Sequence, residues 1–252
     1  YRVAYTGGAS TELSRLDTTS VHAKARAIRR TIEKFHGKPN PKALQEVWDH
    51  LGSKDYHIRY AARIAMEWQD PKSWASKAYS EKNDLAAIHA LLGLARCDLK
   101  GSAKPSIDRL LQINFKDLDK TGKLALLRTY SVIMSRSGMP DPKQVEAMGK
   151  QLDPFFPAND DNLNEELCRL LCYLDHPSVV KKTIALMKTT KAKIPDYDVS
   201  IMKRHAGYGG KILSSMQEEV APNVLNIHFL FCLKDVRTGW TMARRKSYLS
   251  EL

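Results

Sequence analysis

The apolar residues of this chain recur with the spacing of helices that bury one face. Leu44, Val47, Trp48 and Leu51 occupy positions i, i+3, i+4 and i+7, which is the pattern of an amphipathic helix. Similar spacing returns in stretches that begin at Ile58, Ala87, Ile107, Leu124 and Leu167. The pattern predicts successive helices of about 10 to 15 residues each.

Glycine and proline separate these helical stretches. Gly37 is followed by Pro39 and Pro41, and comparable breaks occur at Gly52, Asp70-Pro71, Gly101, Gly138 and Asp153-Pro154. Proline cannot continue a helix, and the residue before it is biased away from helical geometry. Short breaks between helices predict antiparallel pairs, so we expect an all-α fold.

The first residues differ from the rest. Residues 1–5 alternate in the manner of a short strand, and Gly7-Gly8 ends it. An isolated strand is not stable, so it needs a pairing partner. We therefore expect residues 1–20 to form an extended N-terminal segment and residues 21–252 to form one helical domain.

Near the C-terminus, residues 223–233 are apolar enough for a buried helix. The sequence Gly239-Trp240-Thr241 then predicts the end of one helix and the start of another. Glycine is favoured just past a helix end and threonine at the N-cap.

One helix pair has a more specific pattern. Residues 42–51 predict a first helix, Gly52-Ser53-Lys54 a turn, and residues 55–65 a second helix capped by Asp55. This second helix resembles that of a HEAT repeat, in which Asp55, Ile58-Arg59, Ala62 and Ala65 match recurring positions. The resemblance implies a HEAT-like α-α superhelix, a solenoid with a concave binding surface. Asp84 and Asp175 are the expected caps of further, degenerate repeats.

The same resemblance suggests a ladder of polar side chains made by Asp55, Arg59 and Arg63. In HEAT-like stacks the arginine at the position of Arg59 bonds to carboxylates or carbonyls of adjacent repeats. Direct contact of Arg59 with a ligand is the alternative. Arg63 and Glu67 are one turn apart, so they are expected to pair within the helix.

Composition adds a charge that needs an explanation. The chain has 252 residues, with 40 Lys and Arg against 28 Asp and Glu, a formal net charge of +12. Its hydrophobic fraction of 43% excludes general disorder, and no apolar run is long enough to span a membrane. The excess charge predicts an anionic partner, such as an acidic domain, another protein or an anionic polymer.

A basic stretch near the N-terminus is the candidate binding surface for such a partner. Its residues are Arg26, Arg29, Arg30, Lys34 and Lys38. Helical spacing places the three arginines along one face. The alternative is an ordinary solvated helix face, with Ile28, Ile32 and Phe35 buried behind it.

The residues predict no catalytic, cofactor or metal site. Cys168 and Cys172 share one helix face, but their spacing rarely suits a disulfide, and we expect buried thiols. The eight histidines have no ligand spacing, and neither a haem-attachment Cys-x-x-Cys-His nor a Gly-x-Ser-x-Gly elbow occurs.

Several stretches together resemble one family. They are residues 1–7, 35–38, 58–63, 163–171 and 235–241. They are similar to the helical segment of large secreted bacterial multidomain proteins, in which it lies between a sorbosone-dehydrogenase-like β-propeller and a c-type cytochrome segment. The resemblance implies a periplasmic or secreted protein, with Tyr1–Tyr5 as the last propeller strand. It implies a non-catalytic binding or scaffolding module whose parent is an oxidoreductase of the dehydrogenase or cytochrome type.

A nucleic-acid function is the alternative. Trp48, Trp68 and Trp74, with Tyr56, Tyr60 and Tyr79, surround the best repeat, and bases stack on aromatic faces. Basic HEAT-like alkylpurine DNA glycosylases are of similar size, although their tryptophan, aspartate and arginine cleft has no clear match here. The competing interpretation places these aromatic residues in the core.

Overall fold

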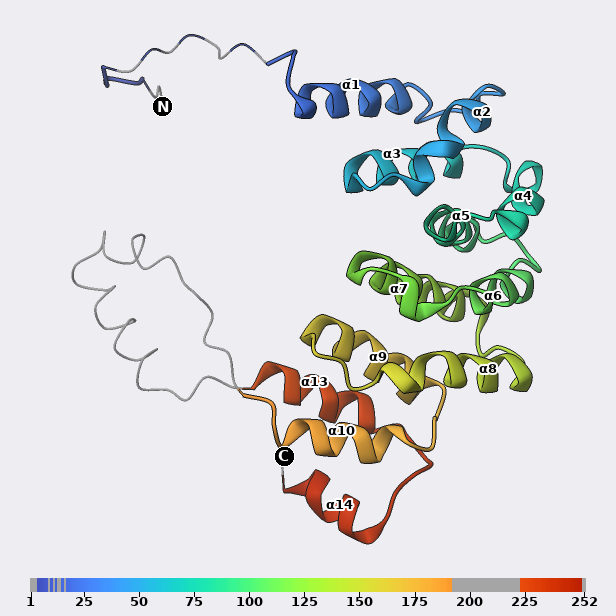
Figure 1. The fold of residues 1–252 in the computed structure, drawn as a ribbon, viewed down its shortest axis with the longest axis vertical. Coiled ribbons are helices and arrows are strands. Elements are labelled where there is room, and N and C mark those ends of the chain that lie inside the picture. The colour runs from blue at the N-terminus through green and yellow to red at the C-terminus, as the bar shows by residue number, and fades with distance from the viewer. Residues whose placement is uncertain are drawn as a thin grey trace.

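The computed structural model describes residues 4–8, 10, 12, 15, 17–191 and 223–250. Within these residues the chain forms twelve α-helices and no strand (Figure 1). The predicted all-α class is confirmed for this part of the chain. Of the expected N-terminal strand, residues 1–3 lie outside the described residues, and Ala4 and Tyr5 have no regular secondary structure.

Most of the helices lie in two rows that run side by side down the molecule (Figure 1). In the first row each helix packs against the next one in order. This row consists of α1 (Val21–Glu33), α3 (Tyr56–Glu67), α5 (Asp84–Arg96), α7 (Lys120–Ser137), α9 (Asp161–Tyr173) and α13 (Val224–Leu233).

The second row is made of shorter helices, with α4 packed on α6 and α6 on α8. It consists of α2 (Ala43–Val47), α4 (Ala75–Ser80), α6 (Ala103–Leu111) and α8 (Pro142–Leu152). At the C-terminal end, α10 (Val179–Met187) packs against α9, α13 and α14 (Met242–Leu249).

Side-chain caps start most of these helices. Such a cap satisfies backbone N–H groups that have no partner inside the helix. The capping side chains belong to Ser20, Asp55, Asn83, Asp119, Asp141, Asp160, Asn223 and Thr241. The predicted roles of Asp55 and Thr241 are therefore confirmed.

Two of the other predicted caps are wrong. Asn83, not Asp84, caps α5, because Asn83 Oδ1 accepts the N–H of Ala86 at 3.0 Å. Asp175 lies before α10, which begins after Ser178, and it accepts the backbone N–H groups of Arg237 and Thr238 at 2.9 and 3.0 Å. Partial burial opposes ionisation of Asp175, but these bonds outweigh it and hold its pKa below the ordinary value.

Two other boundaries also differ from expectation. The helix predicted for residues 42–51 is split into α2 and a 3₁₀ segment, η1 (Trp48–Gly52), which is a common way for a short helix to tighten at its end. Gly239 does not end α13, which stops at Leu233. Instead it has a φ of +77° and lies so close to the Pro177 carbonyl that a Cβ atom would be 2.5 Å from the oxygen.

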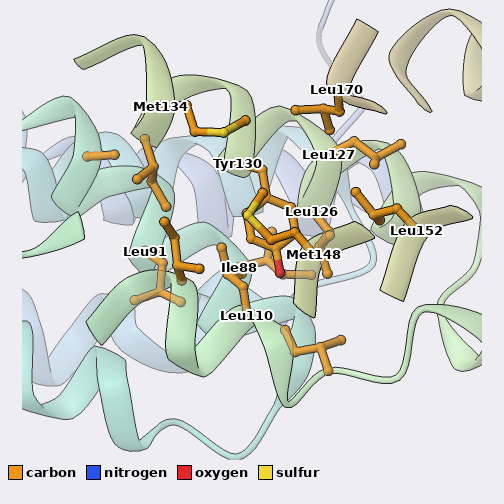
Figure 2. Packing of buried hydrophobic residues seen from close by; sticks show 14 of the residues in the cluster. Ile88, Leu91, Leu110, Leu126, Leu127, Tyr130, Met134, Met148, Leu152 and Leu170 are labelled. Atoms are coloured by element: carbon orange, nitrogen blue, oxygen red, sulfur yellow. The ribbon is translucent and has the colours of Figure 1, made fainter. Parts of the chain in front are cut away.

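The core is centred on α5, in which every residue from Ala86 to Ala95 is buried. Figure 2 shows Ile88 and Leu91 of α5 beside Leu126 and Tyr130 of α7. The terminal helices bury far less: only Ala23 and Ile32 in α1, and no residue in α14. No helix in the described part of the chain has both the length and the apolarity that a membrane crossing requires.

The aromatic and apolar residues divide between core and surface. Trp48 and Trp74 are buried as the core interpretation expects, whereas Trp68, Tyr56 and Tyr60 are about half exposed. Behind the basic stretch, Ile32 is buried and Phe35 partly so. Ile28 is 40% exposed, so the expectation of its burial is wrong.

Candidate binding surface on α1 and α3

A cleft of about 150 Å³ lies between the start of α1 and the start of α3. The two helices pack on each other, and the cleft opens beside the N-terminal halves of both. The lining residues are His22, Ala25, Arg26 and Arg29 from α1, and Asp55, His57 and Ile58 at the start of α3.

The cleft is electropositive. Arg26 and Arg29 are permanent cations, and His22 and His57 add imidazoles that can donate hydrogen bonds. Among the described lining residues Asp55 is the one carboxylate, and it already accepts the N–H groups of His57 and Ile58 at 2.8 and 3.1 Å. The start of a helix also carries a partial positive charge. The arrangement therefore favours an anion.

Each of the two arginines is held by one neighbouring group within the chain. Arg26 Nη2 donates to the Asp17 carbonyl at 2.7 Å. Arg29 Nε lies 3.0 Å from Glu33 Oε1 one turn along α1. The same Nε atom is buried and has no partner with hydrogen-bond geometry among the described residues. Donors on both guanidinium groups therefore remain available to a ligand.

A pair of tyrosines extends the cleft along α3. The rings of Tyr56 and Tyr60 stack with centroids 6.0 Å apart and planes at 26°, and the side chains are 59% and 46% exposed. Arg59 lies 5.9 Å from the Tyr56 centroid, and Arg63 lies 5.0 Å from that of Tyr60. The Tyr56 ring meets the imidazole of His57 edge to face, with centroids 5.4 Å apart. Because His57 lines the cleft, the cleft and the tyrosines adjoin, and together they are called here the α1–α3 surface.

Arg59 itself is buried below this surface. It donates from Nη1 to the Ser53 carbonyl at 2.5 Å and from Nε to His89 Nε2 at 2.9 Å on α5. The expected partners in the adjacent helix pair were carboxylates or carbonyls, and the structure has an imidazole instead. Burial, with smaller contributions from Arg59 and Arg63, lowers the pKa of His89 to about 3. His89 is therefore neutral, with its proton on Nδ1.

Arg63 links the same two helices. Its Nη1 pairs with Glu67 Oε1 on α3 as predicted, and that oxygen also accepts from Arg96 Nε of α5 at 2.8 Å. The structure thus places Asp55 at the N-cap of α3 and Arg59 and Arg63 within this helix, with Arg59 bonded directly to α5 and Arg63 connected to it through Glu67.

The remaining predicted basic residues are separate from the cleft. Arg30, Lys34 and Lys38 are exposed, and none of them lines it. A helix turns by about 100° per residue, so Arg30 and Lys34 point progressively away from the face that holds Arg26 and Arg29. Lys38 follows the end of α1.

Sequence reasoning missed several residues that contribute here. His22 is one turn before Arg26, and this spacing indicates that both lie on the same face of the helix. Tyr56 and His57 directly follow the Asp55 cap. Arg109 of α6 was also missed. It donates to the Glu81 carbonyl at 2.8 Å and to Asp84 Oδ1 at 2.9 Å, which are the kinds of bond that the HEAT resemblance implied for Arg59.

Sulfur atoms gather elsewhere, between α9 and α13. Cys168 Sγ lies 3.8 Å from Cys172 Sγ, and Cys232 Sγ lies 3.4 Å from His228 Nε2. All of these cysteines are free, and the thiol of Cys172 raises the pKa of Cys168. Across the described ranges, no group of three or more His, Cys, Asp or Glu residues is placed to hold a metal ion.

The chain matches no protein-family model and no curated protein, and no solved structure matches it. Its function is therefore inferred from the geometry of the α1–α3 surface.

Proposed function

We propose that this chain is a HEAT-like helical-repeat module that binds an acidic protein segment through the α1–α3 surface. The observation that carries the proposal is the cleft, whose described lining combines Arg26 and Arg29 with one carboxylate, Asp55, that already accepts two backbone N–H groups. Arginine forms bidentate, charge-assisted hydrogen bonds with carboxylates, so side chains of Asp or Glu suit it.

The order of helix contacts supports the repeat architecture. Each helix of the first row packs on the next helix of that row, from α1 through to α13. Repeat arrays have this property because each helix pair buries its apolar face only against its neighbours. The bonds of Arg109 to the Glu81 carbonyl and to Asp84 are of the kind expected between the pairs of a HEAT-like superhelix. Arg59 also joins two pairs, although its partner is an imidazole.

The stacked tyrosines favour a polypeptide partner. Half-exposed Tyr56 and Tyr60 offer apolar ring area together with hydroxyl groups, a combination that is enriched at protein interfaces. In this proposal the partner is a neighbouring domain of the same exported protein, in the periplasm or outside the cell. Any dehydrogenase or electron-transfer chemistry belongs to those other domains, and this chain contributes binding and scaffolding.

An acidic peptide tests the proposal. Fluorescence anisotropy would measure binding of a labelled poly-glutamate peptide at low and at physiological salt. We expect the double substitution Arg26→Gln and Arg29→Gln to weaken binding about tenfold or more, since each lost charge-assisted hydrogen bond contributes about 1.5–3 kcal/mol. The control, Lys143→Gln with Lys181→Gln, removes the same charge from exposed positions on α8 and α10.

Circular dichroism establishes that both variants are folded. Equal losses in the two double variants would mean that net charge, and not the cleft, binds the peptide, and would overturn the proposal. Duplex DNA is the second probe. DNA binding that is tighter than peptide binding and falls steeply with salt would support the DNA-binding alternative instead.

A further inference from the structure

A second cavity, of about 540 Å³, lies at the other end of the chain, far from the α1–α3 surface. Its lining comes from the end of α13, the loop after it, and α14. These helices lie at the opposite end of the stack from α1 and α3 (Figure 1). We propose that this cavity binds a small organic anion with a flat apolar body. The lining residues are Leu233, Lys234, Val236, Arg237, Trp240, Arg245, Tyr248 and Leu249.

The base and walls of the cavity are apolar. Leu233 and Val236 are buried, and the rings of Trp240 and Tyr248 meet edge to face with centroids 5.5 Å apart. The polar atoms of both rings are already bonded to backbone. Trp240 Nε1 donates to the Val236 carbonyl at 2.8 Å, and Tyr248 Oη donates to the Leu230 carbonyl at 3.3 Å. The rings are therefore fixed and offer carbon surface to a ligand.

The rim of the cavity is cationic. Lys234, Arg237 and Arg245 contribute three positive charges. Among the described residues, neither Arg237 nor Arg245 forms an ion pair. Lys234 Nζ lies 3.8 Å from the exposed carboxylate of Asp235, a distance too long for a hydrogen bond. Arg245 is thus the charge most available to an anionic group outside the protein, because Arg237 also interacts with the Asp175 carboxylate and Lys234 Nζ lies 4.1 Å from the centroid of the Phe231 ring.

Size and chemistry together define the ligand class. Pockets for small molecules usually measure about 300–1,000 Å³ and combine apolar walls with a few polar groups that orient the ligand. An aromatic or polycyclic body would lie against Trp240 and Tyr248, while its carboxylate, sulfonate or phosphate group would bond to Arg245. Arginine suits this role because its planar donors match such anions. The site does not depend on the acidic partner proposed for the α1–α3 surface.

Three probes separate the contribution of the ligand's apolar body from that of its negative charge. Isothermal titration calorimetry at low salt would compare naphthalene-2-sulfonate, inorganic sulfate and naphthalenemethanol. We expect the aromatic sulfonate to bind with a dissociation constant below about 1 mM, and each of the other two to bind at least about tenfold more weakly. Sulfate lacks the apolar body, and naphthalenemethanol lacks the charge.

Substitutions then locate the site. Arg245→Gln should weaken binding of the aromatic sulfonate about tenfold or more, and Lys234→Gln should independently weaken it. Lys246→Gln is the matched control, because Lys246 is exposed on the same helix but does not line the cavity. An equal loss in the Lys246 variant, or equal affinity for all three probes, would overturn the proposal. Hydrogen exchange in α14 that matches the wild type shows that this helix remains in place in each variant.

Discussion

Among single residues, His89 shows how burial determines chemistry. Its imidazole accepts a hydrogen bond from the buried Arg59 and is surrounded by the core of α5, so protonation would place a second charge beside a guanidinium group. Burial is the larger cause of its lowered pKa, and the nearby arginines Arg59 and Arg63 add to it. The sequence gives no sign of this, because His89 lies within an otherwise apolar helix.

This histidine makes stability depend on pH. The ordinary pKa of 6.5 falls to about 3 on folding, so below pH 6.5 the unfolded chain binds a proton that the native state does not. Stability is lost as pH falls from 6.5 towards 3, by at most about 1.4 kcal/mol per pH unit from this group. Urea unfolding between pH 7 and pH 4 should show a shallower decline for His89→Gln. His22→Gln, at an exposed position, should retain the wild-type slope.

On the scale of elements, Gln151 of α8 connects three helices. Its Oε1 accepts from Tyr130 Oη of α7 at 2.8 Å, and its Nε2 donates to the carbonyls of Leu110 and Ile113 at 3.0 and 2.9 Å, at the end of α6. Tyr130 is fully buried, so its hydroxyl cannot turn to solvent. The position of α8 on α6 and α7 therefore depends on this amide as well as on apolar packing.

Gln151→Leu should destabilise the protein by about 2–4 kcal/mol, because it leaves buried polar groups unpaired. Adding Tyr130→Phe removes one of these groups, so the double variant should lose less stability than the sum of the single losses, with a coupling of about 0.5–3 kcal/mol. Chemical unfolding measures both quantities. Gln45→Leu, on the exposed face of α2, is the control. Strict additivity would mean that the Gln151 amide and the Tyr130 hydroxyl act independently.

At the scale of the whole molecule, burial is concentrated in the middle of the chain. Every residue from Ala86 to Ala95 of α5 is buried, whereas α1 buries two residues and α14 buries none. In a stack whose contacts join successive helices, only the central helices have a neighbour on both sides. The terminal helices are therefore expected to open without unfolding the centre.

Hydrogen exchange followed by mass spectrometry tests this gradient. Amides of α5 should exchange last, through openings that approach global unfolding, and those of α1 and α14 should exchange at least about tenfold faster. Bound acidic peptide should slow exchange in α1, whereas bound aromatic sulfonate should slow it in α14. Uniform protection along all helices would show instead that the stack unfolds as one unit.

The local sequence pattern was sufficient to predict where the helices lie, but not where each of them begins and ends. The apolar spacing of residues 44–51 identifies a helical stretch, but not its change to a 3₁₀ segment at Trp48, whose indole reaches Glu81 far along the chain. Asp175 resembles a cap in sequence, but its carboxylate accepts hydrogen bonds from residues 237 and 238. The role of Asp175 therefore depends on a contact between segments that are distant in sequence.

The sequence by itself determined the all-α class, the Asp55 cap, the Arg63–Glu67 pair and the excess of positive charge, because these depend on composition or on residues a few positions apart. Only the tertiary structure decided which cations share a surface. It placed Arg26 and Arg29 against the start of α3 and left Arg30 exposed to solvent. It also formed the cavity between α13 and α14. The physical reason is that packing of one helix on another selects a single face of each, and this selection depends on the partner helix.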